Sequence, residues 1–181
     1  MLRASARGLA IGLAALLFGA LVWHAVDALG GPFAIRERFG AYGLAVSVLV
    51  HWSVNLTPLG GVVPMAVANG AIWGFWPGAL VSWSAWVASS FSQYLIARLV
   101  FSDVDASELE RLPKRLLALP IAHPGFQIGA RWLPWIGQSL VSVASAAACV
   151  PAGRFLAYAA VGQAGPAFAM SALGSGLVRL W

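Results

Sequence analysis

The fold is decided by the stretch AYGLAVSVLVHWSVNLTPLGGVVPMAVANGAIWGFW, residues 41–76. Its first apolar run, Ala41 to Leu56, has about 16 residues, which is short of the ~20 that a transmembrane helix needs. The run is then interrupted by Pro58, Gly60, Gly61 and Pro64. A second short apolar run follows and ends at Trp76. Lipid cannot satisfy the polar groups of an opened backbone, so such a break must be buried in protein or line a cavity. We interpret residues 41–76 as a re-entrant hairpin; the alternative is two ordinary helices joined by a Pro-Gly turn.

A second interrupted stretch, residues 126–150, repeats this pattern. It contains the sequence RWLPWIGQ at 131–138, in which Pro134 and Gly137 have the same Pro-x-x-Gly spacing as Pro58 and Gly61. Apolar segments broken by glycine and proline at corresponding places in two halves of a chain are typical of a transporter with a site at the membrane midplane.

Composition places the whole chain in a membrane. Of its 181 residues, 60% are hydrophobic and 9% charged, whereas a soluble domain has about 25% charged residues. The single cysteine, Cys149, excludes an internal disulfide framework and a cysteine-based zinc site. The net charge of +5 comes from scattered basic residues, mostly at the ends of apolar runs, without the dense stripe that nucleic-acid binding needs. We therefore expect topology signals and no nucleic-acid partner.

We expect one membrane domain over residues 1–181, with an all-α, polytopic fold and two opposed re-entrant hairpins. Arg3, Arg7 and the basic residues around the central loop place the N-terminus and that loop in the cytoplasm, so the hairpins enter from opposite sides. The predicted segments are an uncleaved first transmembrane helix at 9–29, the hairpin at 41–76, a transmembrane helix at 77–100 opened by Pro77, an amphipathic cytoplasmic loop at 101–125, the second hairpin at 126–150 and a C-terminal transmembrane helix at 151–181.

Signatures of enzymes are missing from the sequence. The three histidines, His24, His51 and His123, lie far apart and have no acidic partner at the helical spacing of a metal site. The Gly-x-Ser sequence ending at Ser139 has no later histidine to act as its base. We expect no catalytic residue, no metal and no cofactor.

Arg131 is the strongest candidate for a binding residue. It lies five residues into an apolar run and three before Pro134, where an arginine is costly unless it is paired or hydrated. Its guanidinium is always charged and binds phosphate through two hydrogen bonds, so a lipid phosphate is a natural partner. The alternative is an arginine that reaches out to the membrane interface.

Together these residues resemble the DedA/VTT membrane family, also called the SNARE-associated family. The similarity covers roughly residues 40–170. Its motifs are Pro58 through Gly74, Tyr94-x-x-x-Arg98, Arg131-x-x-Pro134, Gln138, the small run Ala144 to Ala148, Phe155, Gly162 and Pro166. The resemblance implies two re-entrant hairpins that face each other, and transbilayer movement of a phospholipid or polyprenyl phosphate by a scramblase or flippase.

The chain departs from the family pattern at three positions. Asn55 stands where the family often has a glutamate, Ser90 where the bacterial branch often has an acidic residue, and Gly137 where a second arginine would fall. There is no acidic residue between Glu37 and Asp103. These differences favour either passive scrambling or a divergent, eukaryote-like subgroup with a less acidic turn.

We therefore expect a protein that moves a phosphate-bearing lipid across the bacterial inner membrane, with membrane lipids as partners and a homo-oligomer left open. Arg131 would hold the phosphate. The route would be lined by Asn55, Thr57, Gln138, Ser90 and Gln93, and the turns would be shaped by Pro58, Gly60, Gly61, Pro64, Pro134 and Gly137. The alternatives are a carrier for a small solute or ion, and a membrane assembly or partner-binding protein without transport activity.

Overall fold

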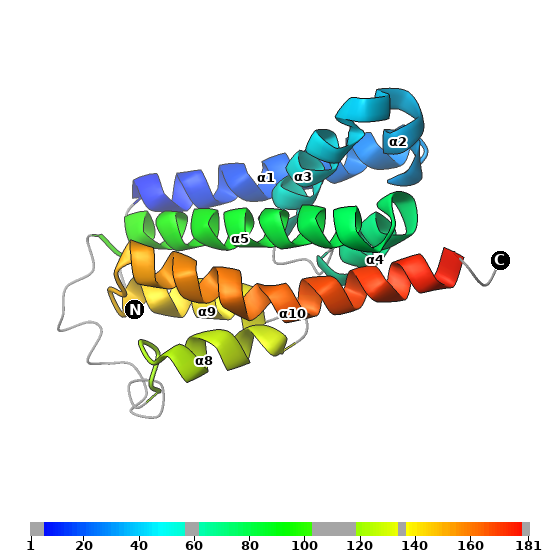
Figure 1. Cartoon of the computed structure of the whole chain (residues 1–181). Helices are drawn as coiled ribbons and strands as arrows, with labels where there is room; N and C mark the ends of the chain where they lie inside the picture. Colours follow the sequence, from blue (N-terminus) through cyan, green and yellow to red (C-terminus); the bar gives the residue numbers. More distant parts are fainter. Residues whose placement is uncertain (1–5, 57–61, 103–118, 134–136, 179–181) are drawn as a thin grey trace.

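Three long helices run the length of the molecule. The computed structural model describes residues 6–56, 62–102, 119–133 and 137–178, and the regular structure in these ranges is helical. The long helices are α1 (Ala6–Ala28), α5 (Phe75–Val100) and α10 (Ala152–Val178), which lie side by side in Figure 1. With 26 residues, α5 is about 39 Å long, which exceeds the ~30 Å hydrocarbon core of a bilayer.

A first pair of short helices occupies one half of this length. The short helix α2 (Phe33–Phe39) and the 3₁₀ turn η1 (Gly40–Tyr42) lead into α3 (Gly43–Asn55), and α4 (Val62–Trp73) follows. With 13 and 12 residues, α3 and α4 are each about 18–20 Å long. Figure 1 shows α3 running from one end of the molecule to its middle and α4 returning to the same end.

A second pair of short helices occupies the other half. The helix α8 (Pro124–Gly129) continues into the 3₁₀ turn η2 (Ala130–Trp132), and α9 (Gly137–Ala147) follows. These helices start and finish at the end opposite to that of α3 and α4 (Figure 1). The two pairs therefore extend to the middle from opposite ends. How they are placed relative to a membrane remains a prediction.

Glycines allow α4 and α10 to approach closely. A side chain at Gly70 would collide with the backbone of Ser171, and one at Gly174 with the backbone carbonyl of Val67. At the far end of α5, the hydroxyl of Tyr94 donates a hydrogen bond of 2.7 Å to the carbonyl of Val150, at the connection between α9 and α10. These contacts fix both short-helix pairs against the central pair of α5 and α10.

The start of α5 differs slightly from the expectation. The helix begins at Phe75, two residues before Pro77, which lies in the first turn where its missing N–H removes no helical hydrogen bond. Gly74, between α4 and α5, has φ +81°, a left-handed conformation that favours glycine. Most of the amphipathic cytoplasmic loop expected at 101–125, residues 103–118, lies outside the described residues.

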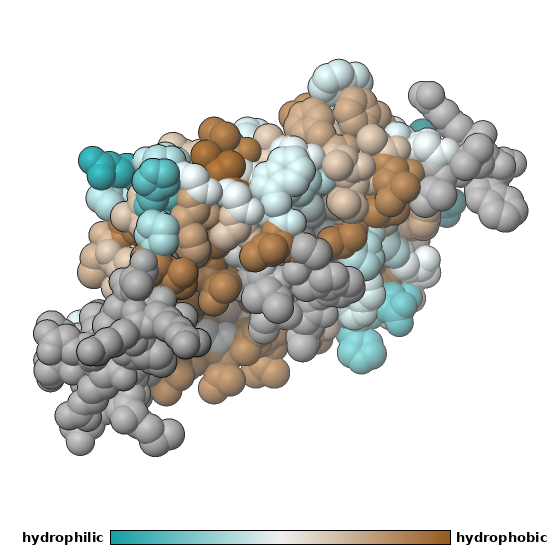
Figure 2. Space-filling view, turned by 90° about the horizontal axis from the view of Figure 1, so that it is seen from below, coloured by the Kyte–Doolittle hydropathy of each residue, from teal (hydrophilic) through white to brown (hydrophobic). Residues whose placement is uncertain are grey.

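The outer surface is largely apolar. Of the residues that the structure describes, one segment, Gly8–Ala28 in α1, is long and apolar enough to cross a membrane by length and composition. Its outward side chains include Leu17, 72% exposed, and Leu21, 69% exposed. Figure 2 shows hydrophilic residues toward the two ends of the molecule and apolar ones over much of the face between them. This is the distribution expected of a protein surrounded by lipid.

Candidate functional site

One turn of α5, halfway along the helix, meets three other elements through hydrogen bonds. Nε2 of Gln138, at the start of α9, donates to Oγ of Ser89 over 2.9 Å. Nε2 of Gln163, in the middle of α10, donates to Oγ of Ser90. Nε2 of Gln93 donates over 2.8 Å to the backbone carbonyl of Asn55, the last residue of α3. We call this group the mid-molecule polar layer: Asn55, Ser89, Ser90, Gln93, Gln138 and Gln163.

Several atoms of this layer are buried without a hydrogen bond. Among the described residues, no partner exists for Nδ2 and Oδ1 of Asn55, for Oε1 of Gln93 or for Oε1 of Gln163. More than nine in ten buried polar groups in proteins are hydrogen-bonded, and an unsatisfied one costs about 1–3 kcal/mol. The layer thus offers one donor and three acceptor atoms to a bound polar group.

Arg131 is buried beside α10. It belongs to η2, which continues α8 at the end nearer the middle of the molecule, and is 5% exposed. Its Nη1 donates to the backbone carbonyl of Gln127 over 2.9 Å, and its Cζ lies 5.0 Å from the centre of the Phe155 ring, a cation–π contact. The side chain therefore does not reach outward to the surface, as a snorkelling arginine would.

The charge of Arg131 is not neutralised by the described residues. Its Nε and Nη2 atoms have no hydrogen-bond partner there. The sequence has no Asp or Glu in residues 38–102 or 111–181, so the elements that surround Arg131 carry no carboxylate. A buried guanidinium with two unpaired nitrogen atoms is costly unless an anion binds to it.

Two neighbours position this side chain. Gln127 lies one helical turn before Arg131, and its Nε2 donates to the carbonyl of Ile121 and to Oγ of Ser145, which fixes α8 against α9. Gly162 of α10 leaves the space for the arginine, because a Cβ there would lie 3.0 Å from Cδ of Arg131. Gly162 precedes Gln163, so Arg131 lies against the turn of α10 that supplies the polar layer.

The structure describes only some of the expected site and turn residues. Arg131, Asn55, Ser90, Gln93 and Gln138 have the positions given above. Gly137 begins α9, where a side chain would collide with the carbonyl of Ala130, and Pro64 is exposed in the first turn of α4. Outside the described residues lie Thr57, Pro58, Gly60, Gly61 and Pro134. The functional roles given to all of these residues remain predictions.

Gln163 and Gln127 were not among the residues expected at the site. Gln163 is a polar residue in an otherwise small and apolar segment, which is itself an indication of a functional position inside a membrane. Gln127 precedes Arg131 by four residues, a spacing that places two side chains on one helix face. Both signals were present in the sequence.

A second buried cluster joins α3, α4 and α5. Nε1 of Trp86 donates over 2.9 Å to Nε2 of His51, and the amide of Asn69 lies 2.9 Å from Nδ1 of His51 and 3.1 Å from Oγ of Ser82. An indole N–H can only donate, so Nε2 accepts and the ring proton of neutral His51 is on Nδ1. This cluster holds the first short-helix pair against α5.

Short helix pairs around a buried polar layer, together with one apolar helix long enough to span a bilayer, are features that favour a helical membrane protein. A family model, the VTT domain, matches residues 60–176, and the chain belongs to this family, the DedA or SNARE-associated family. This confirms the resemblance seen in the sequence. Comparison with curated proteins and with solved structures gave no match. Arg131 and most of the polar layer lie in the matched residues, whereas α1, α2 and α3 precede them.

Proposed function

We propose that the protein moves a phosphate-bearing lipid, a phospholipid or a polyprenyl phosphate, between the two leaflets, as a scramblase or flippase does. The observation that carries this proposal is Arg131, buried with Nε and Nη2 unpaired. These two atoms lie on one edge of the planar guanidinium, the arrangement that binds two oxygens of a phosphate at once. Membrane lipids are the partners that supply this anion inside a bilayer.

The two short-helix pairs provide a route for the headgroup. In this proposal they are opposed re-entrant hairpins, and the polar layer lies between their inner ends at the membrane midplane. The unpaired amide atoms of Asn55, Gln93 and Gln163 replace part of the water that the headgroup loses there. The barrier is lowered because the longest apolar part of the crossing is interrupted halfway.

The proposed movement is passive and involves no catalysis or cofactor. The layer consists of amides and hydroxyls, and the segments that form it contain no carboxylate to carry a proton. We place the protein in the bacterial inner membrane. The basic residues near the ends of the apolar runs favour a cytoplasmic N-terminus.

Leaflet exchange in vesicles tests this function. The full chain is reconstituted in phosphatidylglycerol-containing vesicles with a fluorescent phospholipid, and the outer-leaflet dye is reduced chemically. We expect the inner-leaflet dye to become accessible with the wild type. Arg131→Gln should slow this exchange about tenfold, because hydrogen bonds to a charged group contribute ~1.5–3 kcal/mol. The control is Arg154→Gln, an exposed arginine at the start of α10, which should exchange like the wild type.

The same vesicles separate the alternatives. Exchange no faster than in protein-free vesicles, or an unchanged rate with Arg131→Gln, would contradict the proposal. Uptake of a small anion down a gradient without lipid exchange would indicate the solute carrier instead. Stoichiometric co-purification of another protein, with Arg131 dispensable, would indicate an assembly role.

A further inference from the structure

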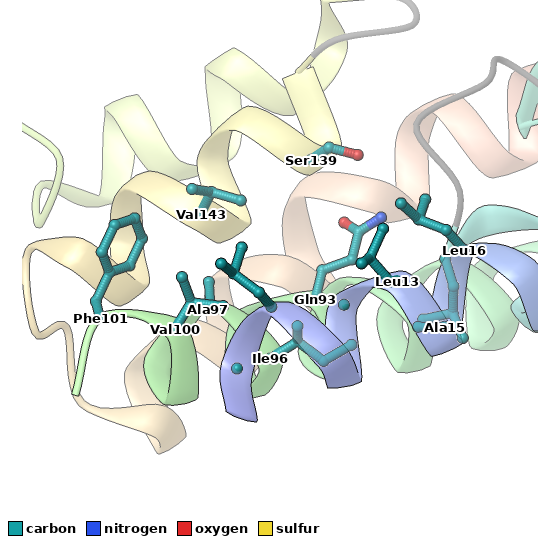
Figure 3. Close-up of a pocket in the computed structure, with 14 residues that line it drawn as sticks. Leu13, Ala15, Leu16, Gln93, Ile96, Ala97, Val100, Phe101, Ser139 and Val143 are labelled. Atoms are coloured by element: carbon teal, nitrogen blue, oxygen red, sulfur yellow. The ribbon is translucent and has the colours of Figure 1, made fainter. Parts of the chain in front are cut away.

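An apolar groove lies beside the polar layer, between α1, α5 and α9. It has a volume of about 350 Å³ and is open on one side. This volume is at the lower end of the ~300–1,000 Å³ typical of ligand sites. Figure 3 shows Val100 and Phe101 toward one end of the groove, and Gln93 and Ser139 nearer the other.

The lining changes from polar to apolar along the groove. Gln93 and Ser139, near the middle of the molecule, are the polar side chains among the described lining residues. From Gln93, the α5 lining continues for about 10 Å to Val100 through apolar side chains alone, and apolar Phe101 follows just after the helix. Gln93 thus belongs to both features: its amide is part of the polar layer and its side chain forms the inner end of the groove.

Small residues of α1 create this space. Gly8, Gly12 and Ala15 face the groove, and a Cβ at Gly12 would have a single close neighbour, Cγ2 of Ile96, at 3.8 Å. The opposite side of α1 carries exposed leucines such as Leu17, on the helix that is apolar enough to cross a membrane. Two residues of the groove itself, Leu9 and Leu13, are 52% and 60% exposed, so its open side is apolar surface, which favours an apolar occupant.

We infer that this groove binds one hydrocarbon chain of a lipid whose phosphate headgroup lies at the polar layer. The inference rests on the proposed function for the headgroup and adds a site for the chain. Transfer of a chain from lipid into the groove gains little from the hydrophobic effect, because lipid tails are equally apolar. The binding energy therefore comes from van der Waals contact along α1, α5 and α9, and the groove orients the lipid with its headgroup toward Gln93.

Photolabelling tests this site. The full chain is reconstituted in vesicles that contain a phospholipid with a photoactivatable diazirine in its acyl chain, and labelled peptides are mapped by mass spectrometry. We expect labels on groove residues of α1, α5 and α9, lost when excess unlabelled phospholipid is added. Gly12→Phe should lower groove labelling about fivefold, because its ring occupies the space of the chain. Leu17→Phe, on the exposed side of the same helix, is the matched control and should leave the labelling unchanged.

Three results would overturn the inference: labelling spread evenly over the exposed faces of α1, labelling that unlabelled lipid does not reduce, and α1-to-α1 cross-links showing that a second copy covers the groove. The competition experiment uses the wild type, so it decides the question even if Gly12→Phe does not fold. Groove labelling without leaflet exchange would support the groove and contradict the proposed function. Leaflet exchange without groove labelling would support the proposed function and contradict the groove.

Discussion

At the scale of single residues, the site is defined by groups that lack partners. Most buried polar side chains of the described residues are paired, as the network around His51 shows. Asn55 and Arg131 are exceptions, because each has buried atoms without a hydrogen bond. An apolar residue at either position would avoid this cost. Unsatisfied buried groups of this kind lower stability and are retained at binding sites.

Asn55 allows this conflict between stability and function to be measured. Asn55→Leu keeps a similar side-chain volume and removes two unsatisfied atoms, so we expect the thermal unfolding midpoint in detergent to stay the same or rise. Lipid exchange should slow several-fold, about 1 kcal/mol in barrier height, because one hydrogen-bonding group is lost from the route. A lower midpoint together with an unchanged exchange rate would show that the amide has a structural role.

At the scale of elements, the helices were predicted from the length of each apolar run and from the glycines and prolines that interrupt it. Short apolar runs ended by glycine and proline predict α3 and α4 as separate half-length helices, because both signals are local. Pro166 shows the limit of such signals, since α10 continues through it from Ala152 to Val178. α10 packs against α4 and α5, and such packing can keep a helix continuous through a proline. A local sequence pattern does not show this packing.

The close approach of α4 and α10 gives a prediction at this scale. Gly174→Ala would place a methyl group against the carbonyl of Val67, which has to move, so we expect a loss of about 1–3 kcal/mol in unfolding free energy. Gly176→Ala, two residues further along α10, meets no atom within 4 Å and should be neutral or stabilising by up to about 1 kcal/mol.

Unfolding midpoints of the two alanine variants, measured side by side in the same detergent, check this difference. Equal midpoints would mean that α4 and α10 do not pack through these glycines.

At the scale of the whole molecule, the order of segments along the chain could be predicted from the sequence. Contacts between side chains on distant helices could not all be predicted. The class of fold, the family and the candidate Arg131 followed from local patterns and motif order. The contact between Gln163 and Ser90 joins residues 73 positions apart. It depends on how α10 is rotated against α5, which no local pattern specifies. Asn55, Ser90, Gln93 and Gln138 were expected along one route, whereas the part that Gln163 takes in the layer is seen only in the structure.

The lack of carboxylates around the site gives a prediction for the molecule as a whole. Proton-driven transporters use chains of Asp, Glu or His along their route, and residues 38–102 and 111–181 contain no Asp or Glu. We expect the same exchange rate with and without an imposed proton gradient, measured in the vesicles described above. Vesicles in which an ionophore collapses the gradient are the control. Acceleration by the gradient would indicate that His51 or another titratable group takes part.

The position of α1 has a consequence for how such proteins diversify. α1 forms one side of the groove, yet it precedes the residues that the family shares. Its small residues line the groove and are not among the described hydrogen-bond or aromatic partners of Arg131. A chimaera that carries the first helix of a relative should then prefer chains of another length or branching while it still accepts the same headgroup. In the proposed mechanism, exchanging this one peripheral helix changes which lipid chains the protein accepts.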